Sequence, residues 1–198
     1  MMIHQAGGEM RQFRRGFTVV ELMIVVAVLG ILVAVALPRI DVQRFRVNGA
    51  VQAIGTTMLT AQRQAVTEQH DMIVYFDTVG QLLRVHSDRN NNGTIDTGEP
   101  MRPVRLGEGI VFGRGGAATM AGAGSGNVNI TKALSGFQAV VFHRDGSASE
   151  AASFYITTVT ASRGTNRPQD ARALLVERAT GRSQWWRYAS GGTWTKVF

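Results

Sequence analysis

The sequence contains no cysteine, and only 4 of its 198 residues are proline. A chain without cysteine has no disulfide framework, no thiolate nucleophile and no zinc site built on thiolates. The patterns G-x-S-x-G and H-E-x-x-H and the Walker phosphate loop are also missing from the sequence. The histidines, His4, His70, His86 and His143, fall in separate segments without the spacing of a paired site. We therefore expect no enzymatic activity and no required cofactor.

Acidic residues are the minority among the charged ones. The chain has 14 Asp and Glu against 21 Lys and Arg, a formal net charge of +7. Residues 1–16 hold three arginines and one glutamate, a charge of +2, which leaves +5 for the remainder. A basic surface suits nucleic acid, anionic lipid or acidic neighbours, but it carries no information on the fold. With 44% hydrophobic residues, the length fits one globular domain and an N-terminal anchor.

One long apolar run, GFTVVELMIVVAVLGILVAVALP, extends from Gly16 to Pro38. The 21 residues that follow Gly16 carry a single charge, Glu21. As a helix they would be about 31 Å long, close to the roughly 30 Å hydrocarbon core of a bilayer. Basic residues precede the run, a pattern that favours a cytoplasmic N-terminus. We predict a single transmembrane helix over residues 17–38, with the rest of the chain outside the cytoplasm.

An ordinary secretory signal peptide is the alternative, because residues 34–36, Ala-Val-Ala, resemble a cleavage site. However, the apolar stretch is long for such a peptide, and Glu21 lies at its entrance. Beyond Pro38, apolar residues recur mostly every three or four positions, at Val42, Phe45, Val51, Ile54, Met58, Ala61 and Ala65. This spacing predicts one helix from Phe17 to about Thr67, kinked near Pro38, whose second half, residues 39–69, is amphipathic.

The N-terminal sequence RRGFTVVELMIVVAVLGILVAVALP resembles the processing site and first helix of type IV pilins and type II secretion pseudopilins. The resemblance implies that residues 1–16 are a leader and that a prepilin peptidase cuts between Gly16 and Phe17. It also implies that the new amine of Phe17 is methylated. The mature chain would then have 182 residues, which is 198 minus 16.

The same resemblance gives Glu21 a role in assembly. A carboxylate and an ammonium are both costly in an apolar setting unless they are paired. The methylated amine of Phe17 in one subunit would neutralise Glu21 in its neighbour, so Phe17 and Glu21 are the expected assembly residues. The implied partners are other pilin or pseudopilin subunits, the prepilin peptidase and the inner-membrane assembly platform. An incidental interfacial carboxylate is the alternative reading of Glu21.

After residue 69 the apolar period changes from 3.6 toward 2, which predicts a β-rich globular domain over residues 70–198. The small side chains of residues 113–126 predict a mobile loop, and Gly181 supplies the left-handed turn of the last hairpin. Three strand pairs are predicted: Asp71–Asp77 with Gln81–Ser87, Phe137–His143 with Ser153–Thr160, and Ala171–Arg178 with Arg182–Tyr188.

The predicted fold class is α+β, with the helix first and an antiparallel sheet packed on its second half. This order, with VVFHRDGSA and a final hairpin turning at Gly-Arg, resembles the GspH/FimT type of minor pseudopilins and minor pilins. The resemblance implies a pilin-like fold, in which a long N-terminal helix packs on an antiparallel β-sheet domain.

The stretch DRNNNGTIDTGE fits the calcium-loop pattern D-x-[DN]-x-[DN]-G-x5-E. Calcium takes about six to eight oxygen ligands, which such a loop can supply. Its flanks read as a strand and a proline-containing loop, so an EF-like loop inside a β-connection is expected. An ordinary turn rich in Asn and Gly is the alternative. The predicted ligands are the side chains of Asp88, Asn90, Asn92, Asp96 and Glu99 and the carbonyl of Thr94, with Gly93 at the turn.

The C-terminal tail GRSQWWRYASGGTWTKVF interleaves basic and aromatic residues, a pattern that can bind nucleic acid. Some minor pilins of the resembled branch are implicated in DNA uptake through a Gly-Arg-x-Arg motif. Gly181 and Arg182 match this motif, but Gln184 replaces its second arginine. The alternative is a terminal strand with one tryptophan in the core. The candidate DNA-binding residues are Arg182, Trp185, Trp186, Arg187 and Lys196.

These observations together predict a minor pilin or minor pseudopilin with a structural role in assembly or priming. The precursor is expected in the bacterial inner membrane, crossing it once, with the C-terminal domain in the periplasm. The mature subunit would then enter an extracytoplasmic filament, either a type IV pilus or a type II secretion pseudopilus. The alternatives are a DNA-binding minor pilin for natural transformation and a secreted protein with an ordinary signal peptide.

Overall fold

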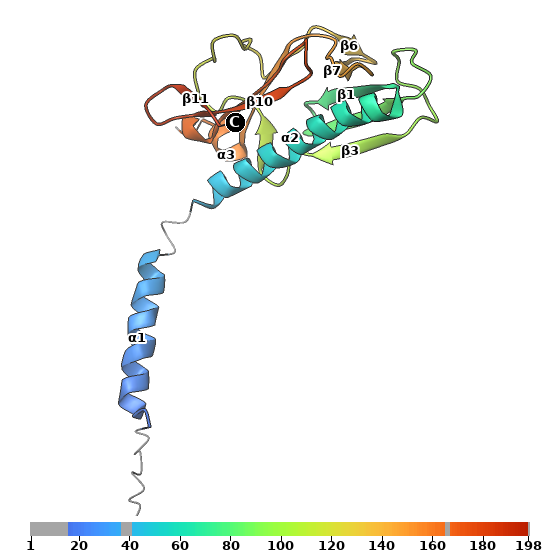
Figure 1. Cartoon of the computed structure of the whole chain (residues 1–198). Coiled ribbons are helices and arrows are strands. Elements are labelled where there is room, and N and C mark those ends of the chain that lie inside the picture. The colour runs from blue at the N-terminus through green and yellow to red at the C-terminus, as the bar shows by residue number, and fades with distance from the viewer. Residues whose placement is uncertain (1–15, 37–40, 165–166, 198) are drawn as a thin grey trace, which may run out of the picture. The chain divides into compact units, whose positions relative to one another are not determined.

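The computed structural model describes residues 16–36, 41–164 and 167–197 (Figure 1). The chain divides into two units between Asp41 and Val42. The first unit contains helix α1, Val19–Ala36. Helix α2, Val42–Glu68, opens the second unit, and Asp41 belongs to neither helix. The sequence analysis predicted one helix through this region with a kink at Pro38, a residue that lies outside the described ranges. What the structure describes is two helices.

Helix α2 is amphipathic, as its apolar spacing predicts. Its buried residues follow at intervals of mostly three or four positions, so they form one stripe along the helix. The helix ends at Glu68, and Gln69 adopts the left-handed conformation that often closes a helix, with φ of 58°. The buried stripe consists of Val47, Ala50, Val51, Ile54, Thr57, Met58, Ala61 and Ala65.

Two antiparallel sheets make up the rest of the second unit. The first has the order β3-β2-β1-β7-β6, and the second has the order β11-β10-β9-β8-β4, with β5 also paired to β8. The strands of the first sheet are β1 Asp71–Asp77, β2 Leu82–Asp88, β3 Met101–Arg105, β6 Ala133–Leu134 and β7 Phe137–Phe142. Those of the second are β4 Ile110–Phe112, β5 Val128–Asn129, β8 Ala152–Thr158, β9 Arg172–Val176, β10 Ser183–Tyr188 and β11 Trp194–Lys196.

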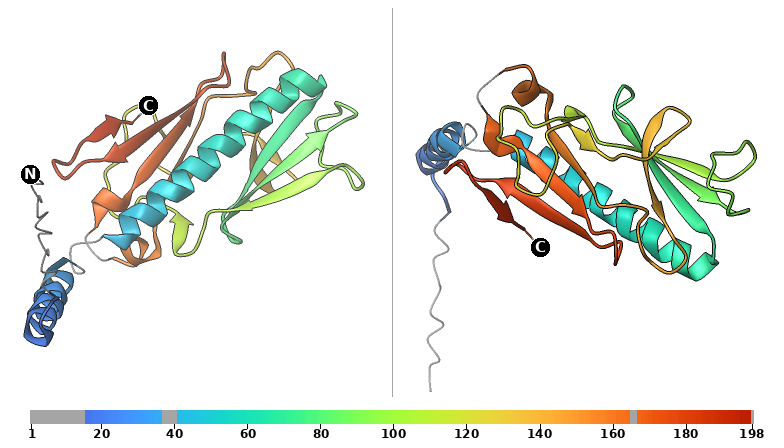
Figure 2. Two further views of the ribbon diagram at one scale, coloured as in Figure 1. Left: turned by 60° about the horizontal axis from the view of Figure 1, so that its bottom comes forward. Right: turned by 90° about the horizontal axis from the view of Figure 1, so that it is seen from above.

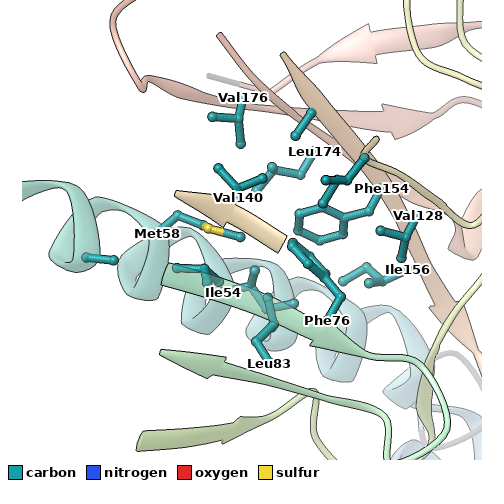
Figure 3. Close-up of a cluster of buried hydrophobic side chains, with 14 of the residues drawn as sticks. Ile54, Met58, Phe76, Leu83, Val128, Val140, Phe154, Ile156, Leu174 and Val176 are labelled. Atoms are coloured by element: carbon teal, nitrogen blue, oxygen red, sulfur yellow. The ribbon is translucent and has the colours of Figure 1, made fainter. Parts of the chain in front are cut away.

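Helix α2 packs against both sheets (Figure 2). One hydrophobic cluster joins Ile54 and Met58 of the helix to Phe76 of the first sheet and to Phe154 and Leu174 of the second (Figure 3). The rings of Phe76 and Phe154 are 4.9 Å apart between centroids, which links the sheets directly. The outer faces of the sheets carry two smaller clusters, one around Ile73 and Tyr75 and one around Met120, Tyr155 and Ala173. The α+β fold class is therefore confirmed.

Two of the three predicted strand pairs are confirmed. Strands β1 and β2 pair from Asp71↔Asp88 to Asp77↔Leu82, and β9 pairs with β10. The turn between β9 and β10 has Gly181 at φ of 62°, the left-handed conformation that the sequence predicts. Gln62 of α2 donates from Nε2 to the carbonyls of Gly146 and Thr180. The helix therefore holds this turn and the one that follows β7.

The predicted pairing of Phe137–His143 with Ser153–Thr160 is wrong. Strand β7 pairs with β1 in the first sheet, whereas β8 pairs with β9 in the second. The segment between them crosses from one sheet to the other, with a single bridge, Phe142↔Ala148. The predicted second strand is also too long, because Val159–Ser162 forms a short helix, α3, capped by the Thr158 side chain. A sequence-adjacent pair was expected because both strands have period-2 patterning, which does not reveal the sheet to which a strand belongs.

The segment 113–126 has neither helix nor strand, in agreement with the predicted loop. The expectation that its side chains are too small to pack is wrong in part, because Ala117 and Met120 are buried. The Met120 N–H donates to the Tyr155 hydroxyl at 3.1 Å, and that hydroxyl donates to the carbonyl of Gly124 at 3.2 Å. Hydrogen bonds to Tyr155 of β8 thus hold this loop in place, although most of its side chains are small. The mobility of the loop stays a prediction.

Candidate functional site

The N-terminus of α1 is capped by Thr18. Its Oγ1 accepts the backbone N–H of Glu21 at 3.1 Å, and its carbonyl accepts the N–H of Leu22 at 3.1 Å. Threonine followed three positions later by glutamate is the capping-box pattern, and a carboxylate in the first turn also faces the positive end of the helix dipole. Sequence analysis considered assembly or an incidental interfacial carboxylate for Glu21 and missed this local role, although T-V-V-E is the signal that could have revealed it.

All described side chains of α1 are exposed. Phe17, at the predicted cleavage point, is 82% exposed, and Ile24 and Val33 are 59% and 54% exposed. A helix that is apolar on every side is normally covered on every side, by lipid or by other protein. In the part of the chain that is described, no helix has both the length and the apolar character to cross a membrane.

The predicted calcium loop joins β2 to β3 and wraps around the buried Asp88. The Asp88 carboxylate accepts the N–H of Asn92 on Oδ1 at 3.1 Å and the N–H of Gly93 on Oδ2 at 2.8 Å. Gly93 has φ of 74°, the left-handed conformation that the sharp turn of such a loop requires. Ile95 packs on the outer face of the first sheet and fixes the middle of the loop there.

The other predicted ligands lie in the same loop. Asp96 accepts hydrogen bonds from the side-chain amides of Asn90 at 3.0 Å and Asn92 at 2.6 Å and from the Thr94 hydroxyl at 3.0 Å. The bond from Asn90, followed by those from Asn92 and Thr94, lowers the pKa of the Asp96 carboxyl below its usual value. These oxygens thus lie in one turn between β2 and β3, hydrogen-bonded to one another.

Glu99 closes the loop from its far end. Its Oε1 accepts the backbone N–H groups of Arg89 at 2.8 Å and Asn90 at 3.2 Å, and its Oε2 lies 2.8 Å from Nε2 of the buried His86. Among the described residues, no three Asp, Glu, His or Cys side chains converge as a metal-binding group. The expected ligand set includes two Asn side chains and one carbonyl beside the acids. Calcium binding stays a prediction.

The structure separates the residues proposed for DNA binding. Trp185 is 2% exposed and belongs to the main core, where its ring meets Phe154 edge-on at 6.3 Å. Trp186 points to the opposite face of the sheet and packs on the cluster around Met120. The structural alternative, one tryptophan in the core and its neighbour on the other face, is therefore confirmed.

The cations of the tail remain accessible. Arg182, Arg187 and Lys196 are exposed, and the Nε of Arg187 donates to the Thr195 hydroxyl at 3.2 Å. DNA contact by these three residues stays a prediction, but Trp185 is not available for stacking on bases in this fold. A nucleic-acid backbone at this tail would therefore contact the exposed cations and not the ring of Trp185.

One buried cation was missed by the sequence analysis. Arg172 of β9 is 4% exposed, and its guanidinium donates to Asn48 Oδ1 from Nη2 at 2.9 Å and from Nε at 3.2 Å. An arginine within the apolar strand sequence ARALLV is the signal that could have drawn attention to it.

One family model matches the N-terminal segment. Residues 11–37 match the prokaryotic N-terminal methylation motif. The pilin-like protein PilA1 of Thermus thermophilus is 30% identical over 98 residues, which are 48% of this chain and 62% of that protein. The match thus spans less than two thirds of the relative.

Two solved structures are similar in fold. Both are of the minor pseudopilin EpsH from the type 2 secretion system of Vibrio cholerae. They are 12% and 15% identical to this chain, with TM-scores of 0.42 and 0.41. The alignments cover 77% and 79% of this chain and 96% of each structure.

Proposed function

We propose that this chain, by its methylation motif a member of the superfamily of type IV pilins and type II secretion pseudopilins, works as a minor structural subunit of such a filament. The precursor is anchored in the inner membrane by residues 17–38 and processed between Gly16 and Phe17. The domain then lies outside the cytoplasm, and the mature subunit joins a type IV pilus or a type II secretion pseudopilus.

The observation that carries this proposal is the surface of α1. An apolar helix with every described side chain exposed needs lipid before assembly and neighbouring apolar helices afterwards. Glu21 is the one carboxylate on that surface, and pairing with an ammonium of a neighbouring subunit would remove two unpaired charges from an apolar setting. The second unit, which holds the whole described core, needs no contribution from α1 to bury its apolar residues.

The first experiment is to determine the mature N-terminus by mass spectrometry, in cells with and without the prepilin peptidase. We expect the chain to start at a methylated Phe17 when the peptidase is present and to keep residues 1–16 when it is not. A mature chain starting at Leu37 would instead identify an ordinary signal peptide and contradict the proposal.

The second experiment separates the two functions of Glu21. In Glu21→Gln the carboxylate is lost, but glutamine also completes a capping box, so the start of α1 is retained. We expect this variant to be processed and membrane-bound but missing from sheared filaments. The matched control, Glu108→Gln, removes an exposed glutamate of the globular unit that pairs only loosely with Arg46, at 3.8 Å. Thr18→Ala, which removes the cap and keeps the charge, should still assemble. Equal assembly of Glu21→Gln and the control would refute the assembly role.

We also propose that the loop from Asp88 to Glu99 binds calcium, which would replace hydrogen bonds within the loop by oxygen–metal bonds. The supporting observation is that the loop already turns around Asp88 with Gly93 left-handed. Calorimetric titration of the full chain with calcium, and with magnesium as reference, tests this. At about 100 times the dissociation constant, calcium should stabilise the fold by about 2.7 kcal/mol. Asp96→Asn should weaken binding and Asp145→Asn should not. No heat and no thermal shift with calcium would exclude the site.

A further inference from the structure

Three arginines gather around one cavity of the globular unit. The cavity measures about 240 Å³ and lies between the first half of α2 and strands β9 and β10. Arg44 and Asn48 line it from α2, Arg172 lines it from β9 and Arg187 lines it from β10. Trp185 forms another part of the wall, so its indole lies next to whatever occupies the cavity.

The buried member, Arg172, is held in place by neutral oxygens. Besides Asn48, its guanidinium donates from Nη1 to the carbonyls of Gln169 at 2.8 Å and Ala171 at 2.9 Å. Burial, followed by the charge of Arg44, lowers the pKa of Arg172 to about 10; the charge of Asp170 opposes this shift, and that of Arg187 adds to it. The guanidinium is nevertheless charged at neutral pH. This buried cation therefore has two positive neighbours, Arg44 and Arg187, and one negative neighbour, Asp170.

This charge is not balanced by a direct ion pair. Arg172 and Arg187 take no part in the ion pairs Arg46–Glu108, Arg84–Asp77 and Arg167–Asp170. A buried charge without a bonded counter-charge is costly, and an anion in the cavity would lower that cost. Arginine forks match the oxygens of a phosphate group, so a phosphate is the anion that this arrangement suits.

The position of the cavity along the chain indicates where that phosphate comes from. Arg44 lies eight residues after Ala36, the end of α1, so even a fully extended chain keeps it within roughly 29 Å of that end. Val42 and Phe45, in the first turn of α2, are 51% and 72% exposed, as expected for side chains that meet a lipid interface. Phospholipid headgroups are the phosphates nearest to a chain anchored by α1.

We infer that the cavity of Arg44, Arg172 and Arg187 binds the phosphate headgroup of an anionic phospholipid of the membrane that holds α1. The inference rests on the proposed membrane anchor. Headgroup binding would hold the globular unit against the bilayer while the subunit waits for assembly. Extraction of the subunit into a filament would then have to release the headgroup.

The test uses the full chain in a neutral detergent, titrated with short-chain phosphatidylglycerol and, as reference, phosphatidylcholine of the same chain length. Tryptophan emission reports occupancy because Trp185 lines the cavity. We expect phosphatidylglycerol to half-saturate the signal at a concentration about tenfold lower than phosphatidylcholine does. Arg44→Gln with Arg187→Gln should raise that concentration by about 30-fold.

The matched control is Arg102→Gln with Arg105→Gln, which removes the same charge from exposed positions of β3. This control should change the half-saturating concentration by less than about twofold. An equal effect of both pairs of substitutions would show that lipid binding depends only on the overall positive charge, and would overturn the inference. Saturation by inorganic phosphate without a preference for phosphatidylglycerol would assign the cavity to free phosphate and overturn it. Tighter binding of a single-stranded oligonucleotide through the same arginines would do so as well. Failure of the membrane anchor itself would appear separately, as a chain extracted from membranes without detergent.

Discussion

Replacing Trp185 by alanine tests whether the C-terminal tail is core or ligand-binding surface. The side chain is 2% exposed, meets Phe154 edge-on, and lies in the cluster that joins α2 to both sheets. Removal of a buried tryptophan costs about 3–5 kcal/mol, the sum of lost burial and a residual cavity. For a chain of this size that corresponds to a fall in Tm of roughly 6–20 °C.

Trp186→Ala is the matched control, because the adjacent residue has the same chemistry on the opposite face of the sheet. Trp186 is only partly buried, so its loss should cost less than about 2 kcal/mol. Urea unfolding followed by circular dichroism measures both values without relying on tryptophan emission. Equal losses for the two variants, or a loss below about 1 kcal/mol for Trp185→Ala, would refute the placement of Trp185 in the core.

A double-mutant cycle with Gly55 sharpens the test. A Cβ added at Gly55 of α2 would lie 2.7 Å from the Trp185 Nε1, closer than carbon and nitrogen normally approach. Gly55→Ala should therefore destabilise the native chain. In the Trp185→Ala background the obstacle is gone, and the same change should stabilise by up to about 1 kcal/mol through helix propensity. An effect of the same sign in both backgrounds would contradict the observed contact.

Three further predictions follow from other parts of the globular unit. The Gly80 N–H, and secondarily a side-chain hydrogen bond from Arg84, lower the pKa of Asp77 from its usual 3.8. The stabilising contribution of this carboxylate is therefore present above pH 3.8 and is lost as pH falls through the lower folded value. Asp77→Asn should reduce Tm more at pH 7 than at pH 2, and equal reductions at both would refute this. Arg182→Gln with Lys196→Gln should reduce the salt slope of DNA binding by about 0.9 per lost phosphate contact, whereas an unchanged slope would show that the tail does not touch DNA. Met120→Ala should speed proteolysis within the glycine-rich loop, because it removes the buried side chain that packs with Tyr155 and Ala173, and an unaltered cleavage rate would show that Met120 does not secure the loop.

What the sequence predicts well is what depends on local periodicity. The three-to-four spacing from Val51 to Ala65 is enough to predict α2 and its buried face, although Val42 and Phe45, which were expected on that face, are exposed. Alternation with a turn residue is enough to predict the hairpins β1–β2 and β9–β10. The calcium-loop pattern likewise predicts the turn around Asp88, because its hydrogen bonds link residues close in sequence.

What the sequence does not predict depends on partners distant along the chain. Strands β7 and β8 are neighbours in sequence, yet they belong to different sheets because α2 offers a surface to each. The packing of the loop against Tyr155 and the contact of Arg172 with Asn48, 124 positions away, were missed for the same reason. The cap at Thr18 is the exception, since its pattern is local and was available in the sequence.

The placement of α2 between two sheets has a mechanical consequence. Val42 is where the covalent chain enters the folded unit, so tension arriving from α1 is borne by α2 before any strand. The buried residues of α2 between Val47 and Ala65 pack against both sheets. A force on the helix is therefore distributed over many contacts, which have to break together. If the subunit is held in a filament through α1, as proposed, a pull on the filament would load the α1 contacts and α2 before it could separate one sheet from the other.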